Sequence, residues 1–416
     1  MPIANRAVRP VLAACLAAAC GLAPGGARAD VVTEWNARID AIVTAGNLPN
    51  HPATRAYAFA HTAIYEAMNA VTRRYAAGAA ALVVPEDASA DAAAAAAARG
   101  ALLQTLPAQR EAIEAAYAAA LGSLPEGPSR QAGIELGARA AAAVLAQRGD
   151  DGASAPEQYR PLTRPGAYVP TVLPLVPQWP QRRPWLMASA SQLRPGPPPP
   201  LASDTWARDY NETQAYGGRT STRRSAEQTE IARFWEASGP PIYNGLVRGV
   251  AEAAGRDPTR NARLFAALAQ ATDDAYIAVF DAKYHYQFWR PVTAIRNGDL
   301  DGNDATERDP SWTPFIATPL HPEYPCAHCI IAATVAAVLQ LDAGAQALPP
   351  LSTRSPSANG ASRHWATPDA LVQEVADARV WDGVHFRHST EIGVAMGRRI
   401  GDLVRERFFA RPAAAP

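Results

Sequence analysis

The chain has little of what several classes of protein require. Its 39 Lys and Arg residues equal its 39 Asp and Glu residues, so it lacks the positive excess of a dedicated nucleic-acid-binding protein. After residue 29 no apolar run reaches the roughly 20 residues that a membrane-spanning helix needs. No internal repeat and no convincing alternation of apolar and polar residues is present. With 48% apolar residues, the chain is nevertheless expected to be soluble and globular, so any anion binding must depend on a local cluster of cations.

The N-terminal segment has the three parts of an export signal. Basic Arg6 and Arg9 precede an apolar stretch, 11–22, and an A-x-A cleavage site ends at Ala29. We expect residues 1–29 to be a signal peptide and the mature protein to be periplasmic or secreted.

Cysteine is also scarce. Two of the four cysteines lie inside the expected signal peptide, so the mature chain keeps Cys326 and Cys329, spaced C-x-x-C, in a compartment that permits disulfides. A thiol–disulfide exchange site would use the same pattern, but the chain lacks the β-α-β pattern expected around a thioredoxin-like motif. Zinc is poorly supported, because Cys326, His328 and Cys329 crowd within one turn and lack the usual two-pair spacing.

The composition divides the mature chain into three regions. Residues 30–150 are rich in alanine with apolar positions at helical spacing, which predicts an N-terminal helical layer. Residues 151–225 are interrupted by prolines, which exclude regular helix or central strand and predict an ordered strap packed on the body. Residues 226–410 return to helical spacing and are expected to form the helical core. The predicted fold class is all-α, in one domain, with helices at 31–75, within 88–148, and at 226–237, 241–255, 259–289, 329–341, 368–376 and 386–409.

Three short fragments of the core region together offer the groups that bind a tetrahedral oxyanion. They are residues 283–291 (KYHYQFWRP), 325–328 (PCAH) and 379–385 (RVWDGVH). Between them they contain three permanent cations, the histidines His328 and His385, and the expected start of a helix. Phosphate and vanadate are anions that such a set can bind.

The spacing within the first two fragments explains how each could bind an anion. Lys283 and Arg290 lie seven residues apart, two turns along one face of the predicted helix, which should end before Pro291. Residues 325–328 precede an apolar run, so they should form a helix N-terminus, whose free N–H groups and dipole favour an anion.

The third fragment adds a guanidinium and an imidazole. Gly383, between Arg379 and His385, indicates a turn into the final helix. Arg379 could bind the anion through two nitrogens, and His385 could use one ring nitrogen as nucleophile or ligand if a partner holds the other. Taken singly, each fragment is more typical of a solvated face or a helix-capping histidine, so the hypothesis rests on their combination.

The combination resembles a known superfamily. Type 2 phosphatidic acid phosphatases, bacterial non-specific acid phosphatases and vanadium-dependent haloperoxidases share K-x6-R-P, P-S-G-H and S-R-x5-H, and this chain is similar in order and spacing. Over about residues 31–408 it further resembles soluble bacterial proteins related to the vanadium haloperoxidases. Their Y-V-P-T, S-Q-F-R-P and H-P-E-Y-P segments look like residues 168–171, 191–195 and 321–325. The resemblance implies an all-α pair of helical bundles of the vanadium chloroperoxidase and acid phosphatase type.

The resemblance also implies which residues bind the anion. Lys283, Arg290 and Arg379 would bind its equatorial oxygens, and the backbone near Cys326 and Ala327 would complete the cradle. Two of these positions depart from the family pattern, since Cys326 stands in place of serine and Ala327 in place of glycine. A side chain at Ala327 narrows the close backbone approach that glycine permits.

The histidines receive separate roles by the same resemblance. His385 would bond covalently to vanadium or phosphorus, and His328 would be the acid–base histidine. The aspartate that follows the nucleophile by four residues in the phosphatases is Ser389 here. The group that orients His385 is therefore not evident from the sequence, and Asp382 and Glu391 are the candidates.

Two functions are compatible with this site. As a haloperoxidase, the protein would hold a vanadate cofactor on His385 and oxidise a halide with hydrogen peroxide. As a soluble acid phosphatase it would need no cofactor, and it would cleave a phosphate ester through a phosphohistidine while His328 protonates the leaving oxygen. The resemblance makes His321 a candidate residue of the halide pocket, and it favours the haloperoxidase, because family bromoperoxidases carry histidine at this place and chloroperoxidases carry phenylalanine. Cys326 favours the phosphatase, because a thiol at a helix N-terminus oxidises easily unless a disulfide to Cys329 protects it.

We expect the haloperoxidase, with the phosphatase as the alternative. The partners in either case are small molecules and include neither nucleic acid nor a membrane. The departures at Cys326, Ala327 and Ser389 also allow a third possibility, an oxyanion-binding protein without turnover.

Overall fold

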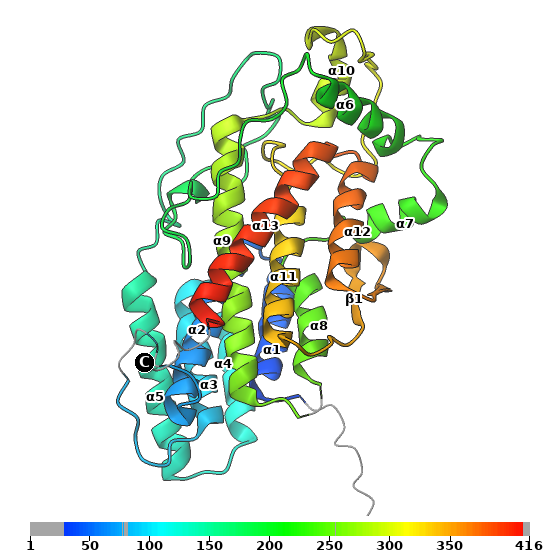
Figure 1. Cartoon of the computed structure of the whole chain (residues 1–416). Helices are drawn as coiled ribbons and strands as arrows, with labels where there is room; N and C mark the ends of the chain where they lie inside the picture. The colour runs from blue at the N-terminus through cyan, green and yellow to red at the C-terminus, as the bar shows by residue number, and fades with distance from the viewer. Residues whose placement is uncertain (1–28, 77, 79–81, 254, 411–416) are drawn as a thin grey trace, which may run out of the picture.

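The computed structural model describes residues 29–410, except 77, 79–81 and 254. Over these residues all regular structure is helical apart from one two-stranded sheet, so the predicted all-α class is confirmed (Figure 1). All but the last residue of the expected signal peptide lies outside the described residues. None of the described helices is both long and apolar enough to cross a bilayer. The α-helices are α1 (Val31–Ala45), α2 (Asn50–Thr72), α3 (Ala90–Thr105), α4 (Arg110–Gly122), α5 (Pro128–Arg148), α6 (Asp204–Gly217), α7 (Ala226–Phe234), α8 (Pro240–Ala251), α9 (Pro258–Tyr286), α10 (Pro291–Arg296), α11 (Ala327–Ala343), α12 (Pro368–Trp381) and α13 (Arg387–Phe408).

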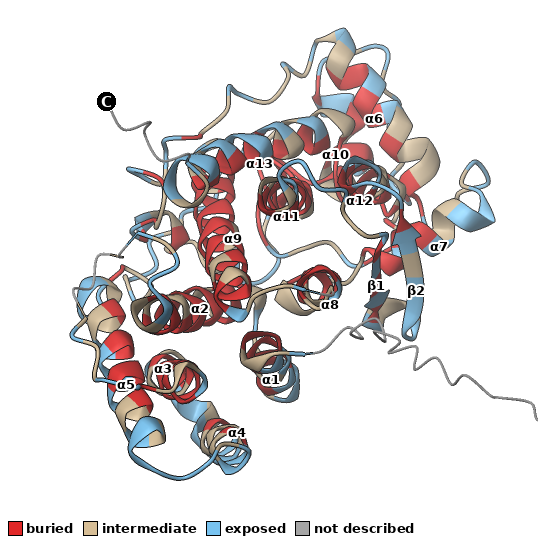
Figure 2. Ribbon diagram, turned by 60° about the horizontal axis from the view of Figure 1, so that its bottom comes forward, coloured by how far each residue is buried: buried red, intermediate tan, exposed pale blue. Residues whose placement is uncertain are grey.

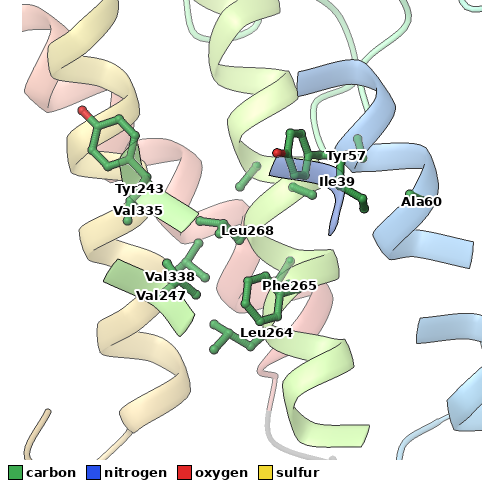
Figure 3. Packing of buried hydrophobic residues seen from close by; sticks show 14 of the residues in the cluster. Ile39, Tyr57, Ala60, Tyr243, Val247, Leu264, Phe265, Leu268, Val335 and Val338 are labelled. Atoms are coloured by element: carbon green, nitrogen blue, oxygen red, sulfur yellow. The ribbon is translucent and has the colours of Figure 1, made fainter. Parts of the chain in front are cut away.

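Helix α9 runs through the middle of the molecule and is buried on nearly all sides (Figure 2). The Asp257 side chain caps its first turn by accepting from the Arg260 N–H at 3.0 Å. On one side α9 packs against α2 of the N-terminal helices, and on another against α11 and α13. Apolar side chains from these helices and from α8 fill the space between them, including Tyr57, Tyr243, Val247, Leu264, Phe265, Leu268, Val335 and Val338 (Figure 3).

Helices α11, α12 and α13 form the C-terminal side of the core. Contact between α11 and α13 is close because glycines of α13 face the backbone of α11. A Cβ atom placed on Gly397 would lie 2.5 Å from the Ile330 carbonyl oxygen, which is shorter than any normal contact. The start of α11 is therefore held at a fixed distance from the first turns of α13.

The segment from 150 to 203 follows the surface of the helical body. Within it the structure describes no regular element except the 3-10 helix η2 (Trp179–Gln181), as the prolines lead one to expect. Two neighbouring carboxylates of α9 hold this segment. Asp273 pairs with Arg182 at 2.6 Å, and Asp274 accepts the backbone N–H groups of residues 185–187 at 2.6, 2.8 and 2.9 Å.

Three elements differ from the sequence-based prediction. Helix α6 lies inside the segment predicted as strap, and Ser203 caps it by accepting from the Trp206 N–H at 3.2 Å. Helix α9 ends at Tyr286, because Gln287 adopts a left-handed backbone (φ 48°). A hairpin of β1 (Leu351–Ser355) and β2 (Ala361–Trp365) was not predicted. Burial alternates along β1, but five residues are too few for the periodicity to be evident in the sequence.

Candidate oxyanion-binding site

The first two cations bind the same loop, residues 321–323. Lys283, in the last turn of α9, is fully buried, and its Nζ donates to the Pro322 and Glu323 carbonyl oxygens at 2.9 and 2.7 Å. Arg290 donates from Nε to the His321 carbonyl oxygen at 2.9 Å. The prediction that both cations lie on one face of a continuous helix is wrong, because the helix ends at Tyr286 and Arg290 is extended before α10. They meet because both bind the loop.

The third cation, Arg379, lies in the last turn of α12. It is 1% exposed, and its Nη1 donates to the Trp235 carbonyl oxygen at 2.9 Å and pairs with Asp382 at 2.6 Å. Its Nε is buried and has no partner among the described residues. Part of this guanidinium is thus available to a ligand.

His385 lies between α12 and α13, in the turn that the glycine predicted. Gly383 has φ 81°, and a Cβ there would lie 2.3 Å from the Gly217 carbonyl oxygen, so the turn requires glycine. The His385 backbone N–H donates to the Arg379 carbonyl oxygen at 3.1 Å. This hydrogen bond ties the third cation and the histidine together.

The partners of the His385 ring define its tautomer. Arg290 Nη1 lies 3.3 Å from Nε2, and a guanidinium can only donate, so Nε2 is the unprotonated nitrogen. The proton is then on Nδ1, which lies 2.7 Å from Glu323 Oε1 and donates to it. This is an assignment from the hydrogen-bond network. His385 thus has an unprotonated Nε2, with Arg290 Nη1 as its neighbour, and a carboxylate behind Nδ1.

Glu323 is therefore the group that orients His385, and the two candidates from the sequence are not. Asp382 is committed to Arg379 and to the Val384 N–H, and Glu391 is exposed on α13. Ser389 stands 3.5 Å from His385 Nδ1 and hydrogen-bonds to Glu323. The available signal was a lone glutamate in the H-P-E-Y-P segment, but its partner lies 62 residues away in sequence.

The helix N-terminus predicted at residues 325–328 is present. Cys326 is the N-cap of α11, and its Sγ accepts from the Cys329 N–H at 3.2 Å. The same two cysteines form a disulfide. The Cys326 N–H donates to the Ser389 carbonyl oxygen at 3.1 Å, so it is not free for a ligand. The remaining first-turn N–H groups of α11 begin at Ala327, on the wall of the cavity.

His328 also lines this cavity. Its ring hydrogen-bonds to the Ala237 backbone, which places the proton on Nδ1, and its buried Nε2 has no partner among the described residues. Burial and the nearby Arg379 lower the pKa of His328 well below its ordinary value. His328 is thus a neutral imidazole with an available acceptor nitrogen.

The cavity has a volume of about 280 Å³. Five of the predicted residues line it: Ala327, His321, His328, Arg379 and His385. Lys283, Arg290 and Cys326 do not line it, and the two cations lie behind the loop at 321–323. Residues that the sequence did not single out complete the wall, including Asn50, His51, Glu236, Ser238, Tyr243, Tyr276 and Phe280.

The charges around the cavity are unbalanced. Burial lowers the pKa of Lys283 well below its ordinary value, and it lowers the pKa of Arg290 to about 10. Burial raises the pKa of Glu323 to about 7 and that of Asp382 to about 6. Three buried basic groups thus face two buried carboxyl groups that resist ionisation, and a third carboxyl group on the wall, Glu236, is only partly buried. A bound anion would favour the charged forms of the buried basic groups. These residues fit a tetrahedral oxyanion.

Comparisons with known proteins bear on the family and the fold of the chain. Residues 263–411 match the family model for the VCPO second helical-bundle domain. A segment of 141 residues is 30% identical to the vanadium chloroperoxidase of Curvularia inaequalis, and it covers 28% of this chain but only 22% of the chloroperoxidase.

Solved structures extend the similarity of fold over most of the chain. A bacterial vanadium-dependent iodoperoxidase has a TM-score of 0.77 at 22% identity, covering 91% of this chain and 97% of the other. A bacterial vanadium-dependent chloroperoxidase in its apo form has a TM-score of 0.69 at 18% identity, covering 86% and 94%. The fold is thus that of the helical vanadium haloperoxidases. Together with the family match over residues 263–411, this supports the resemblance to the vanadium haloperoxidase superfamily that the motifs suggested.

Proposed function

We propose that this protein is a vanadate-dependent haloperoxidase-like enzyme. The observation that carries the proposal is the cluster of buried basic side chains around a cavity that also contains an unprotonated imidazole nitrogen, His385 Nε2, with Arg290 beside it. Two structural relatives, a bacterial vanadium-dependent iodoperoxidase and a bacterial vanadium-dependent chloroperoxidase, support the same activity. Vanadate, when bound, would supply the activation of hydrogen peroxide for halide oxidation.

The residues have distinct tasks in this proposal. Lys283, Arg290 and Arg379 offset the negative charge of the oxyanion, and they do so in a buried site where electrostatic interactions are strong. His385 would hold the anion through Nε2, while Glu323 keeps the proton on Nδ1 and the ring in place.

The second histidine is suited to proton transfer. His328 Nε2 accepts a proton most easily once a bound anion has offset the charge of Arg379, which otherwise lowers the pKa of this ring. Its position on the cavity wall allows it to take a proton from one bound species and return it to another.

A second candidate function is hydrolysis of phosphate monoesters. The pairing of His385 with Glu323 favours it, because a neutral imidazole backed by a carboxylate is an activated nucleophile. His385 Nε2 would form a bond to phosphorus as the bond to the ester oxygen breaks. The leaving oxygen would take a proton from protonated His328, and water would then hydrolyse the phosphohistidine.

A parallel assay distinguishes the two functions. Purified protein, with and without orthovanadate, is tested for bromide-dependent halogenation with hydrogen peroxide and for hydrolysis of a phosphate monoester. The proposal predicts halogenation that requires both vanadate and His385, with loss on His385→Ala. Hydrolysis that vanadate inhibits, without halogenation, would establish the phosphatase instead. If vanadate binds and neither activity appears, the protein is an oxyanion-binding protein.

A further inference from the structure

The cavity wall includes a histidine that belongs to neither the matched family domain nor the predicted site. His51 lies in the first turn of α2 and is 6% exposed. It lines the same cavity as His321, His328 and His385, yet neither of its ring nitrogens has a partner among the described residues. A buried polar group without a hydrogen bond lowers stability, so this ring is expected to have a role toward something in the cavity.

Aromatic rings hold His51 in place. Its ring centroid lies 4.5 Å from that of Phe280, 5.1 Å from Tyr276 and 5.6 Å from Trp179, all in edge-to-face arrangements. Phe280 also contacts His321, with ring centroids 5.0 Å apart. The two imidazoles therefore share one aromatic neighbour and lie on the same part of the wall.

The second imidazole has a defined donor. Arg290 Nη2 lies 3.0 Å from His321 Nδ1 and can only donate, whereas the Pro322 carbonyl oxygen lies 3.2 Å from the same nitrogen and can only accept. The shorter contact favours the tautomer with the proton on Nε2. No acceptor pairs with this Nε2–H in the described part of the chain. Burial, and the nearby Arg182, lower the pKa of His51 to about 3, so this ring also stays neutral and donates through one N–H.

The chemistry around His51 and His321 favours one kind of anion over another. Neutral N–H donors between aromatic rings suit a large, polarisable and weakly hydrated anion better than a small, strongly hydrated one. The permanent cations Arg290 and Arg379 make the potential in the cavity favourable for any anion. A volume of about 280 Å³ leaves room for such an ion beside a tetrahedral oxyanion.

We propose that His51 is a further residue of the halide pocket and that, beside the candidate His321, it binds bromide or iodide in the wall of the cavity. The proposal rests on the haloperoxidase function and names the residues that position its halide. It assigns the N-terminal helices a direct part in substrate binding, through a residue outside the domain that the family model matches. His51 is thus a specificity-determining residue for the halide.

Halide binding can be measured without turnover. Bromide-81 NMR line broadening on vanadate-free protein should show saturable binding to the wild type, weakened at least about tenfold in His51→Phe, which keeps the ring but removes the N–H. The matched control is His364→Phe, which removes an exposed histidine of β2 and should leave binding unchanged. Equal affinity in His51→Phe would overturn the proposal.

A second measurement uses the wild type alone and does not depend on how a variant folds. Crystals soaked in bromide should give an anomalous peak within hydrogen-bond distance of both His51 and His321. A peak elsewhere in the cavity, or none, would contradict the assignment. Because neither measurement needs activity, a failed halogenation assay with a positive bromide site rejects the proposed function and keeps this site. If the enzyme is active but bromide does not bind there, the proposed function is kept and this site is rejected.

Discussion

Glu323 lies on the loop at 321–323, and its carboxylate receives the Nδ1–H of His385 at 2.7 Å and the Phe386 N–H at 3.2 Å. Lys283 and Arg290 bind the same loop, because Lys283 donates to the Glu323 carbonyl oxygen and Arg290 to the His321 carbonyl oxygen. The type of residue at this position therefore affects both the tautomer of the histidine and the charge of the cavity. The sequence showed the cations and both histidines of the site but not this carboxylate, because nothing local marks it as a partner of His385.

Replacement of Glu323 by glutamine should lower the affinity of the site for orthovanadate without abolishing binding. The amide can either accept from or donate to Nδ1, so it no longer requires the proton on that nitrogen and admits the tautomer with the proton on Nε2, which cannot bind an anion through a lone pair. We predict an affinity for orthovanadate about 10- to 100-fold lower in Glu323→Gln, measured by equilibrium dialysis. Glu391→Gln, at an exposed position of α13, is the control and should bind as the wild type does. Wild-type affinity in Glu323→Gln would show that the carboxylate has no part in holding His385.

The affinity for an oxyanion that is held by charge alone, without a bond to His385, should fall as the pH rises. The pKa of Glu323 is raised to about 7 and that of Asp382 to about 6, so both carboxyl groups become negative across this range. Lys283, whose pKa is lowered, loses positive charge in the same direction. Since an anion binds best to the protonated forms, affinity is highest below these pKa values and is lost as the pH rises through them.

Sulfate is the suitable probe for this effect because its own charge does not change. We predict that its dissociation constant, from calorimetry, rises at least roughly tenfold between about pH 5.5 and about pH 8. The change should be smaller in Glu323→Gln, which removes one of the titrating groups. A dissociation constant that stays flat or falls with pH would contradict the charge assignment of the cavity.

Helices α11 and α13 bring the two ends of the site together, and their sequence patterns explain why parts of it were predictable. The start of α11 was evident from residues 325–328 before an apolar run, and the turn before α13 from Gly383. The end of α9 was not evident, because Gln287 is not a residue type that marks a left-handed turn. Arg290 therefore reaches the site from an extended segment rather than from a helix.

The spacing of α11 and α13 depends on a glycine. Alanine at Gly397 would place a Cβ 2.5 Å from the Ile330 carbonyl oxygen, so the helices must separate. We predict that Gly397→Ala lowers the free energy of unfolding by about 1–3 kcal/mol in urea denaturation. It should also weaken oxyanion binding, since the first turn of α11 and His385 move apart.

A second glycine provides the matched control. Gly249 lies in α8 with nothing within 4 Å of its Cβ position, so Gly249→Ala should raise stability by roughly 0.5–1 kcal/mol through the higher helix propensity of alanine. If both variants changed stability equally, the close contact at Gly397 would not be what holds the helices.

At the scale of the whole molecule, the cavity is built from parts that are far apart in sequence. The matched family domain supplies the cations and the histidines at 321, 328 and 385, and α2 supplies Asn50 and His51. The periodicity of residues 31–75 predicted helix there but gave no sign that one of its histidines faces a site in the core. Patterns in a single sequence indicate elements and motifs. Contacts between α2 and α9 join residues more than 200 positions apart, and no local pattern marks such pairs.

The central claim is that one oxyanion binds in this cavity on His385, and equilibrium dialysis with orthovanadate tests it most directly. We predict that the wild type binds a single vanadate per chain, that phosphate competes for it, and that His385→Ala loses the binding. His364→Ala, at an exposed position, should bind as the wild type does. Vanadate binding that is absent from the wild type, or undiminished in His385→Ala, would contradict the account.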